Sequence, residues 1–316
     1  MSSPYSSCTL CPRNCQVDRT GSETGYCGQS DQIVISTATL HFGEEPPIAG
    51  EGGSGTIFFS GCTLRCPFCQ NWQVSCGLTG SEITIDLLIE IMLKLQNKGA
   101  ENINFVTGTH LLPSIKEAVT KAQLRGLIIP LVWNCSGYET LETIDELNTF
   151  IDIYIPDYKT SDSNLAERLF QASDYPKIAE HSILKMVENR VLEFTEDGKM
   201  KKGVIIRHLA LPGELESSRR FFKWYSENLK GKAIISVMIQ YTPVKIPWNT
   251  VRIPDRQISQ QEYEKLLDYM DEYEIEEGFF QDLETGNDWL PDFNKIQPFP
   301  SKQTKVIWSS VVGDFV

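Results

Sequence analysis

Three cysteines, Cys62, Cys66 and Cys69, lie in the run GTIFFSGCTLRCPFCQNW and are the residues of this sequence best suited to chemistry. Soft thiolates bind zinc, copper(I) or iron–sulfur clusters, and a cubane cluster normally takes four of them from the protein. Three neighbouring ligands therefore imply either a distant fourth ligand or one supplied from outside the protein. An iron atom without a protein ligand would be a place for chemistry, and a zinc knuckle is the alternative interpretation.

A second group of cysteines lies near the N-terminus, with two, three and eleven residues between successive members: Cys8, Cys11, Cys15 and Cys27. This density predicts one metal site, which either zinc or a second iron–sulfur cluster would occupy. The chain has nine cysteines, and their odd number and clustering indicate metal binding in a reducing compartment rather than a secreted disulfide framework.

The elements that must position the first group are strands and helices in alternation. Residues 56–59, before Cys62, are β-branched or aromatic and predict a buried strand, and Gly61 permits a sharp exit. From Gly55 onward, β-rich runs alternate with helical periodicity, which is typical of parallel βα units. The expected strands span residues 56–60, 102–107, 127–133, 151–155, 204–209 and 234–240. The expected helices span residues 84–98, 113–124, 139–149, 163–171, 178–192, 215–229 and 259–273.

Six such units predict an α/β fold, namely a partial, open (β/α)6 barrel. Right-handed crossovers make the strands parallel and bring their carboxyl ends to one rim, where closed barrels have their active sites. Residues 1–50 are rich in Cys, Gly and Ser and are expected to form a small metal-binding appendage. Residues 51–290 are expected to form the barrel, and residues 291–316, which contain three prolines, a C-terminal wrapping tail.

The composition excludes few classes of protein, but the net charge makes one class of binding partner less favourable. The formal net charge of −13 disfavours a nucleic-acid partner, because such binding needs lysine and arginine to neutralise phosphates. The sequence has no apolar run long enough for a membrane helix and no signal-like beginning, so we expect a cytoplasmic protein without a membrane partner.

The CxxxCxxC spacing after a strand, with Phe68 before the third cysteine, resembles the radical S-adenosylmethionine (SAM) superfamily. Within it, residues 8 to about 290 resemble an uncharacterised group similar to pyruvate formate-lyase activating enzyme. The segments that carry this likeness are CTLCPRNC, GYCG, HFGEEPP, GCTLRCPFCQNW, VTGTH, WNCSGY, PDYK and RHLALPG. The resemblance implies a 4Fe–4S cluster on Cys62, Cys66 and Cys69, with SAM chelating the fourth iron. It also implies an oxidoreductase that cleaves SAM reductively to a 5′-deoxyadenosyl radical, which abstracts hydrogen from a substrate.

The resemblance further implies which residues bind SAM, although it assigns no catalytic residue. Residues 106–110 stand where related enzymes have a GGE-type motif whose backbone binds the SAM amino group, and here the motif is altered to TGTH. The implied cofactor-binding residues are Thr107, Gly108, Thr109, Asn134, Ser136, Asp157, Lys159 and Arg207. For Asp157 and Lys159, the alternative to SAM binding is a structural salt bridge at the strand end. For His110, the two interpretations are a direct catalytic role and packing at the entry to a helix.

Three functions agree with these features. The first is an activase that makes a glycyl radical in a partner protein, with a reductant such as flavodoxin or ferredoxin. The second uses the same chemistry on a small metabolite or a peptide, and it is favoured by the altered TGTH loop. The N-terminal cysteines also favour it, because activases with ferredoxin-like clusters insert their cysteines after the SAM loop. The third is a non-catalytic iron–sulfur redox protein.

Overall fold

The computed structural model describes residues 3–21, 23–283, 290–300 and 302–316. Its centre is a parallel sheet in which six main strands are neighbours in chain order. These strands are β2 (Ser54–Phe59), β4 (Ile103–Val106), β5 (Leu131–Cys135), β6 (Ile153–Pro156), β8 (Met200–Leu209) and β9 (Ile234–Met238). The short β10 (Phe279–Phe280) adds a parallel edge next to β9. The sheet does not close on itself, so the predicted α/β class and partial barrel are confirmed.

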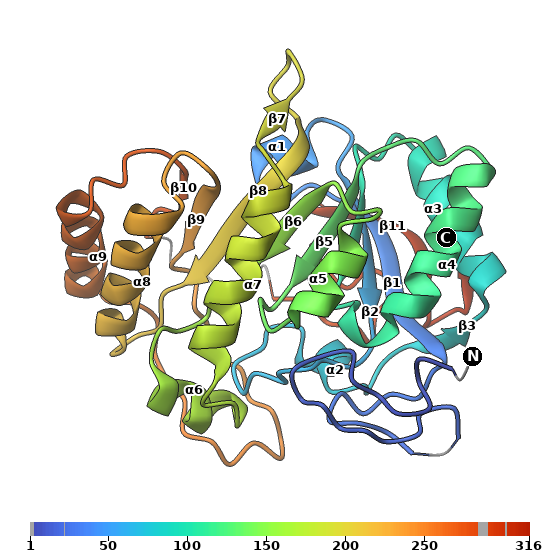
Figure 1. Cartoon of the computed structure of the whole chain (residues 1–316), viewed down its shortest axis with the longest axis horizontal. Helices are drawn as coiled ribbons and strands as arrows, with labels where there is room; N and C mark the ends of the chain where they lie inside the picture. Colours follow the sequence, from blue (N-terminus) through green and yellow to red (C-terminus); the bar gives the residue numbers. More distant parts are fainter. Residues whose placement is uncertain (1–2, 22, 284–289, 301) are drawn as a thin grey trace.

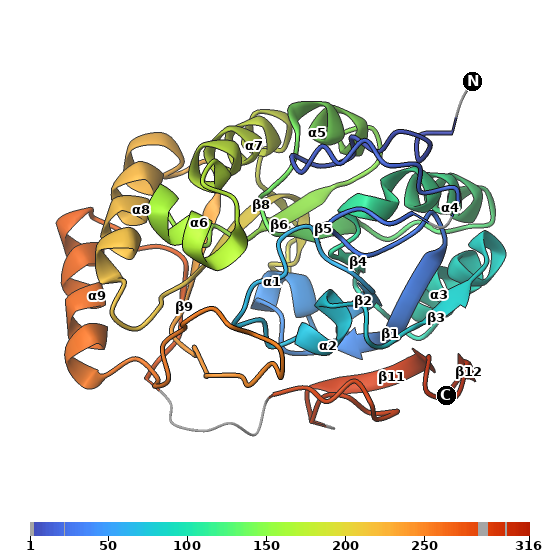
Figure 2. The same cartoon turned by 90° about the horizontal axis from the view of Figure 1, so that it is seen from below.

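Seven longer helices connect and cover these strands, each close to its expected range. They are α3 (Ile85–Asn97), α4 (Leu112–Leu124), α5 (Leu141–Leu147), α6 (Ser163–Phe170), α7 (Tyr175–Asn189), α8 (Leu215–Asn228) and α9 (Gln260–Glu272). Figure 2 shows all of them except α6 along the outer side of the curved sheet. In α3, Thr84 caps the first turn by accepting the N–H of Leu87 at 3.2 Å, and an apolar stripe faces the sheet.

Antiparallel strands extend the sheet beyond the barrel. β1 (Ile33–His41) pairs with β2 on one side and with β11 (Thr304–Ser309) on the other. The short β3 (Ser81–Ile83) pairs with β1, and β12 (Asp314–Phe315) pairs with β11. The limits expected at residues 50 and 291 therefore do not coincide with the edges of the sheet, and residues 284–289 of the expected barrel lie outside the described residues.

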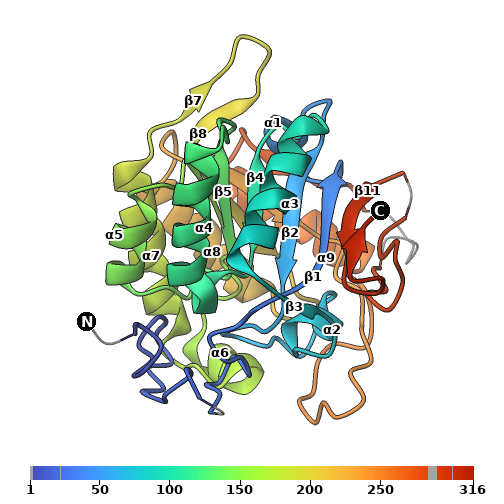
Figure 3. The same ribbon diagram turned by 90° about the vertical axis from the view of Figure 1, so that its right-hand side faces the viewer.

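The two ends of the barrel differ. The carboxyl ends of the parallel strands lie at the end occupied by the N-terminal segment, α2 (Trp72–Ser75) and α6 (Figure 1). The hairpin of β7 (Glu193–Phe194) and β8 projects from the opposite end, near α1 (Pro46–Ala49) (Figure 3). Among the described residues, no helix is both long and apolar enough to cross a membrane.

Candidate active site

The loop after β2 carries the three cysteines and is held by backbone contacts. Gly61 turns the chain with φ of 87°, and its N–H donates to the carbonyl of Val74 at 2.9 Å. A Cβ at this position would lie 2.4 Å from Cγ of Gln29, so only glycine fits. The N–H of Cys69 donates to the carbonyl of Cys66 at 3.0 Å, which closes the turn between the second and third cysteines.

All three thiols line one cavity of about 520 Å³. Cys62 and Cys66 are buried and Cys69 is half-buried, and none forms a disulfide. Burial raises the pKa of the Cys66 thiol, and it raises the pKa of Cys69 to about 11. These thiols therefore need a cationic partner to ionise, as metal ligands do.

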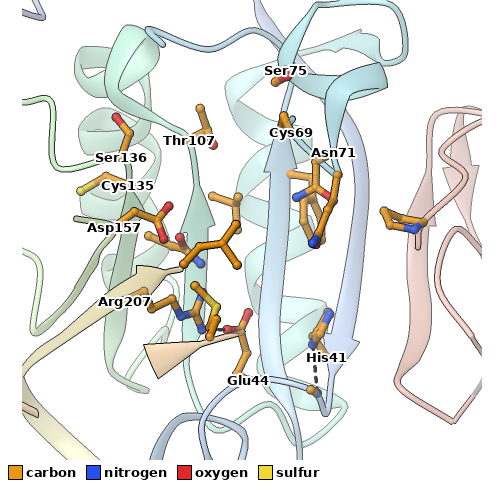
Figure 4. Close-up of a pocket in the computed structure, with 18 of the residues that line it drawn as sticks. His41, Glu44, Cys69, Asn71, Ser75, Thr107, Cys135, Ser136, Asp157 and Arg207 are labelled. Carbon is orange, nitrogen blue, oxygen red and sulfur yellow. Dashed lines mark hydrogen bonds and ion pairs between the residues drawn. The ribbon is translucent and has the colours of Figure 1, made fainter. Parts of the chain in front are cut away.

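The facing wall of the cavity comes from the ends of β4, β5 and β6. Thr107, Asn134, Ser136, Asp157 and Lys159 all line the cavity. Figure 4 shows Thr107, Ser136 and Asp157 on the side opposite Cys69 and Asn71. The structure thus brings these five predicted residues together with the cysteines, as parallel strands with a common rim require.

Thr107, in this wall of the cavity, has a strained backbone conformation. Its φ of 61° is in the left-handed region, which a β-branched residue seldom adopts. Such strain is typical of ligand-binding positions. Its N–H donates to the carbonyl of Asn134 at 2.9 Å, so the residue offers the cavity acceptors rather than a backbone donor.

Asp157 and Lys159 form an ion pair of 2.9 Å between Oδ2 and Nζ. Burial alone would lower the pKa of Lys159, but the neighbouring Asp157 charge raises it well above its usual range. The hydroxyl of Tyr175 accepts the Lys159 N–H at 2.8 Å and lies 2.9 Å from the carbonyl of Ser136. This tyrosine fixes the spacing between the loops after β5 and β6.

Arg207 also lines the cavity, but its guanidinium is already paired. Its Nε donates to Glu45 at 2.8 Å, its Nη2 donates to the same carboxylate at 2.5 Å, and Glu44 binds Nη2 as well. Although burial raises the pKa of Glu45, the Arg207 charge lowers it below its usual range. In Figure 4, Arg207, Glu44 and His41 lie toward the end of the cavity away from Ser75. Sequence reasoning gave these glutamates no role, although the acidic pair before two prolines in HFGEEPP was a signal.

The radical SAM superfamily model matches residues 56–222, from β2 into α8 and just over half of the chain. The chain belongs to the radical SAM superfamily. The uncharacterized protein MJ0674 of Methanocaldococcus jannaschii is 31% identical over 284 residues, which cover 86% of this chain and 76% of that protein.

Solved radical SAM structures are similar at low identity. Streptococcus suis SuiB bound to S-adenosylmethionine is 16% identical, with a TM-score of 0.46 over 70% of this chain and 48% of SuiB. The FeFe-hydrogenase maturase HydG of Carboxydothermus hydrogenoformans is 15% identical, with a TM-score of 0.47 over 67% of this chain and 49% of HydG. A domain of pyruvate-formate lyase-activating enzyme from Bacteroides vulgatus is 12% identical, with a TM-score of 0.35 over 54% of this chain and 88% of that domain. The chain thus spans about half the length of the first two proteins.

Radical SAM enzymes carry a 4Fe–4S cluster and SAM, and the donor set at this cavity fits both. Three soft thiol donors share one wall, and the polar groups of the facing wall suit a ligand that carries both amino and carboxylate groups. Within the described residues, no three Cys, His, Asp or Glu side chains are placed to hold one metal ion. A cubane distributes its cysteines over separate iron atoms, so its ligands need not meet around one point.

Two of the predicted radical SAM cofactor residues do not line the cavity. A Cβ on Gly108 would lie 2.7 Å from Ile115 and 2.9 Å from the Trp133 ring, so this glycine permits close packing. The Thr109 hydroxyl donates to Glu139 at 2.7 Å. The neighbouring His110 is buried, and its Nε2 lies 2.8 Å from the carbonyl of Ser60, just before the loop that carries the three cysteines. Burial lowers the pKa of His110 to about 3, so this ring packs in its neutral form.

Glu139 is a buried residue beside Cys135, which lines the cavity, and sequence reasoning missed it. Burial raises its pKa to about 8, although hydrogen bonds from Thr109 and Cys135 oppose the shift. Its second carboxyl oxygen has no hydrogen-bond partner among the described residues. No sequence signal identifies it, since its burial depends on the packing of the loop before α5 against the loop after β4.

Proposed function

We propose that this protein is a radical SAM enzyme that takes a hydrogen atom from a substrate bound in the cavity of about 520 Å³. The observation that carries the proposal is that the three thiols and the polar residues after β4, β5 and β6 share this one cavity. Its volume lies in the range of small-molecule sites. When bound, the cluster and SAM supply a reductive cleavage that yields the 5′-deoxyadenosyl radical.

The residues of the chain have separate tasks in this proposal. Cys62, Cys66 and Cys69 hold the cluster. The carbonyl and hydroxyl of Thr107 would accept hydrogen bonds from the SAM amino group, because its N–H is already bonded to the carbonyl of Asn134. The Lys159 ammonium, kept charged by Asp157, would bind the carboxylate and ribose of SAM. Arg207 forms hydrogen bonds with Glu44 and Glu45 in the cavity wall. A hydrogen bond from Arg207 to SAM would have to compete with these two carboxylates.

The test is SAM cleavage under strictly anaerobic conditions with dithionite, read out as 5′-deoxyadenosine. We expect Cys69→Ala to abolish cleavage and Cys76→Ala to retain it. Cys76 is the matched control, since it lies just past the loop but does not line the cavity. Equal cleavage by both variants would exclude Cys69 as a ligand that the reaction needs. No cleavage by the parent protein with a full complement of iron would exclude the proposed chemistry and favour a redox protein.

For the substrate, we propose a glycine in a partner protein, because the activase-like segments from HFGEEPP to RHLALPG each contribute residues to the cavity wall. The reductant is then a flavodoxin or ferredoxin. Incubating reduced enzyme and SAM with candidate glycyl-radical proteins should yield a doublet in the electron paramagnetic resonance spectrum. If every candidate stays silent while a fraction of cell extract raises 5′-deoxyadenosine formation, the substrate is a metabolite or a peptide instead.

A further inference from the structure

The four N-terminal cysteines lie on the loops that precede β1. Cys8, Cys11 and Cys27 are buried, Cys15 is half-buried, and all four are free thiols. The carbonyl of Cys8 accepts the N–H of residue 16 at 2.9 Å, which folds the segment between the first three cysteines back on itself. The N–H of Tyr26 donates to Sγ of Cys15 at 3.3 Å, which brings the fourth cysteine against the third.

A fully buried arginine lies beside this group. Arg19 has no exposed surface, and its Nη1 donates to Sγ of Cys8 at 3.4 Å. Its other hydrogen bonds go to the backbone carbonyls of Gln29, Ser30 and His110. In the part of the chain that the structure describes, no carboxylate forms an ion pair with it, whereas Arg207 has two such partners.

An unpaired buried cation is costly, and backbone carbonyls reduce this cost without supplying the missing negative charge. Four neutral thiols do not supply it either. Four thiolates on a zinc ion or an iron–sulfur core carry a net negative charge and would supply it. The guanidinium is placed to donate to one of their sulfurs, and hydrogen bonds to cluster sulfurs are an established feature of such centres.

We propose that Cys8, Cys11, Cys15 and Cys27 bind a second metal centre, with Arg19 as its buried counter-ion. The ligands are thiolates, so the centre is an iron–sulfur cluster or a zinc ion. In the described part of the chain, neither group of cysteines is arranged to bind one metal ion. A single zinc ion at the N-terminal site therefore needs its four thiols to move closer together. This site is separate from the cavity, none of whose lining residues it includes.

The second centre abuts the loop of the first. Arg65, between Cys62 and Cys66, donates to the carbonyl of Cys27 at 3.3 Å. Arg13 donates to the carbonyl of Thr63 at 2.9 Å and lies 3.7 Å above the ring of Tyr26. A metal at the N-terminal site would therefore stabilise the segment that contacts the loop of Cys62, Cys66 and Cys69.

The experiment measures metal and acid-labile sulfide in the full-length protein after anaerobic reconstitution with iron and sulfide, and separately with zinc. The triple variant with Cys62, Cys66 and Cys69 changed to alanine leaves the N-terminal site intact. We expect it to retain either about half of the iron or one zinc ion per chain, which distinguishes the two occupants. Further change of Cys11 and Cys27 to serine should remove that remaining metal, whereas Cys76→Ser should not.

A second measurement keeps the test decisive if the triple variant fails to fold. In the otherwise unchanged chain, the double change Cys11→Ser and Cys27→Ser should lower the total metal content. The spectrum of the first cluster should still change when SAM is added. A folded triple variant that binds neither metal, or a parent protein whose metal is fully explained by the first cluster, would overturn the proposal. Because the readout is metal content, its failure is independent of whether SAM is cleaved.

Discussion

Changing Glu139 to glutamine should make the protein more stable near neutral pH and leave it unchanged in acid. The Glu139 carboxyl is 1% exposed, and one oxygen accepts the Thr109 hydroxyl at 2.7 Å. Burial raises its pKa to about 8, so the folded protein binds a proton that the unfolded chain releases at much lower pH. Glutamine has nearly the same shape and keeps an acceptor for Thr109, but it carries no charge to bury.

The direction and size of this difference in stability follow from proton linkage. Between the unfolded and folded pKa values the folded state holds the extra proton, so raising the pH removes stability from the parent protein at about 1.4 kcal/mol per pH unit. From about pH 5.5 to pH 7.5 the loss is about 2–3 kcal/mol, and Glu139→Gln avoids it. For a domain of this size the two melting temperatures should diverge by roughly 5 °C over that range.

The assay is thermal unfolding of parent and Glu139→Gln proteins at matched iron content, since bound metal stabilises the folded state by itself. Glu90→Gln is the control, because Glu90 is exposed on α3 and its charge stays in water. Melting curves of parent and variant that shift in parallel with pH would refute the reasoning. So would a variant that is destabilised equally at every pH, which would indicate loss of packing rather than relief of a buried charge.

Two other substitutions probe the packing that holds the cavity. Gly108→Ala places a Cβ within 2.9 Å of both Ile115 and Trp133, and the overpacking should lower the free energy of unfolding by about 1–3 kcal/mol. An unchanged urea midpoint would mean that the ring moves aside freely. Glu45→Gln leaves the Arg207 guanidinium with one charged partner, and we expect a loss of about 3 kcal/mol by urea denaturation. Stability equal to that of the parent protein would show that Glu45 is not needed to neutralise this arginine.

Local pattern was sufficient to predict the barrel. The helix expected at residues 84–98 is α3, Ile85–Asn97, because its apolar residues recur at helical spacing and Thr84 caps it. The strand β1 was not predicted, although its sequence IVISTATLH is rich in β-branched residues, because the surrounding segment is dominated by Cys, Gly and Ser. Its partner β11 lies near the other end of the chain, and no local signal connects the two.

The site could be predicted only as far as topology determines it. Parallel strands bring the loops after β4, β5 and β6 to one rim, so the meeting of Thr107, Asn134 and Asp157 with the cysteines follows from the order of elements. Side-chain direction does not follow. Arg207 pairs with Glu45, which is 162 residues away, because α1 reaches the cavity from outside the barrel repeat.

The charges of the cavity indicate what it is suited to bind. Its charged lining residues are Glu44, Glu45, Asp157, Lys159 and Arg207, and burial lowers the pKa of His41 and favours its neutral form. Three carboxylates against two cations leave one excess negative charge before any ligand enters. In a half-buried site this excess favours a ligand with net positive charge and opposes an anionic one. SAM has a sulfonium, an ammonium and a single carboxylate, so its net charge matches the cavity better than an anionic metabolite does.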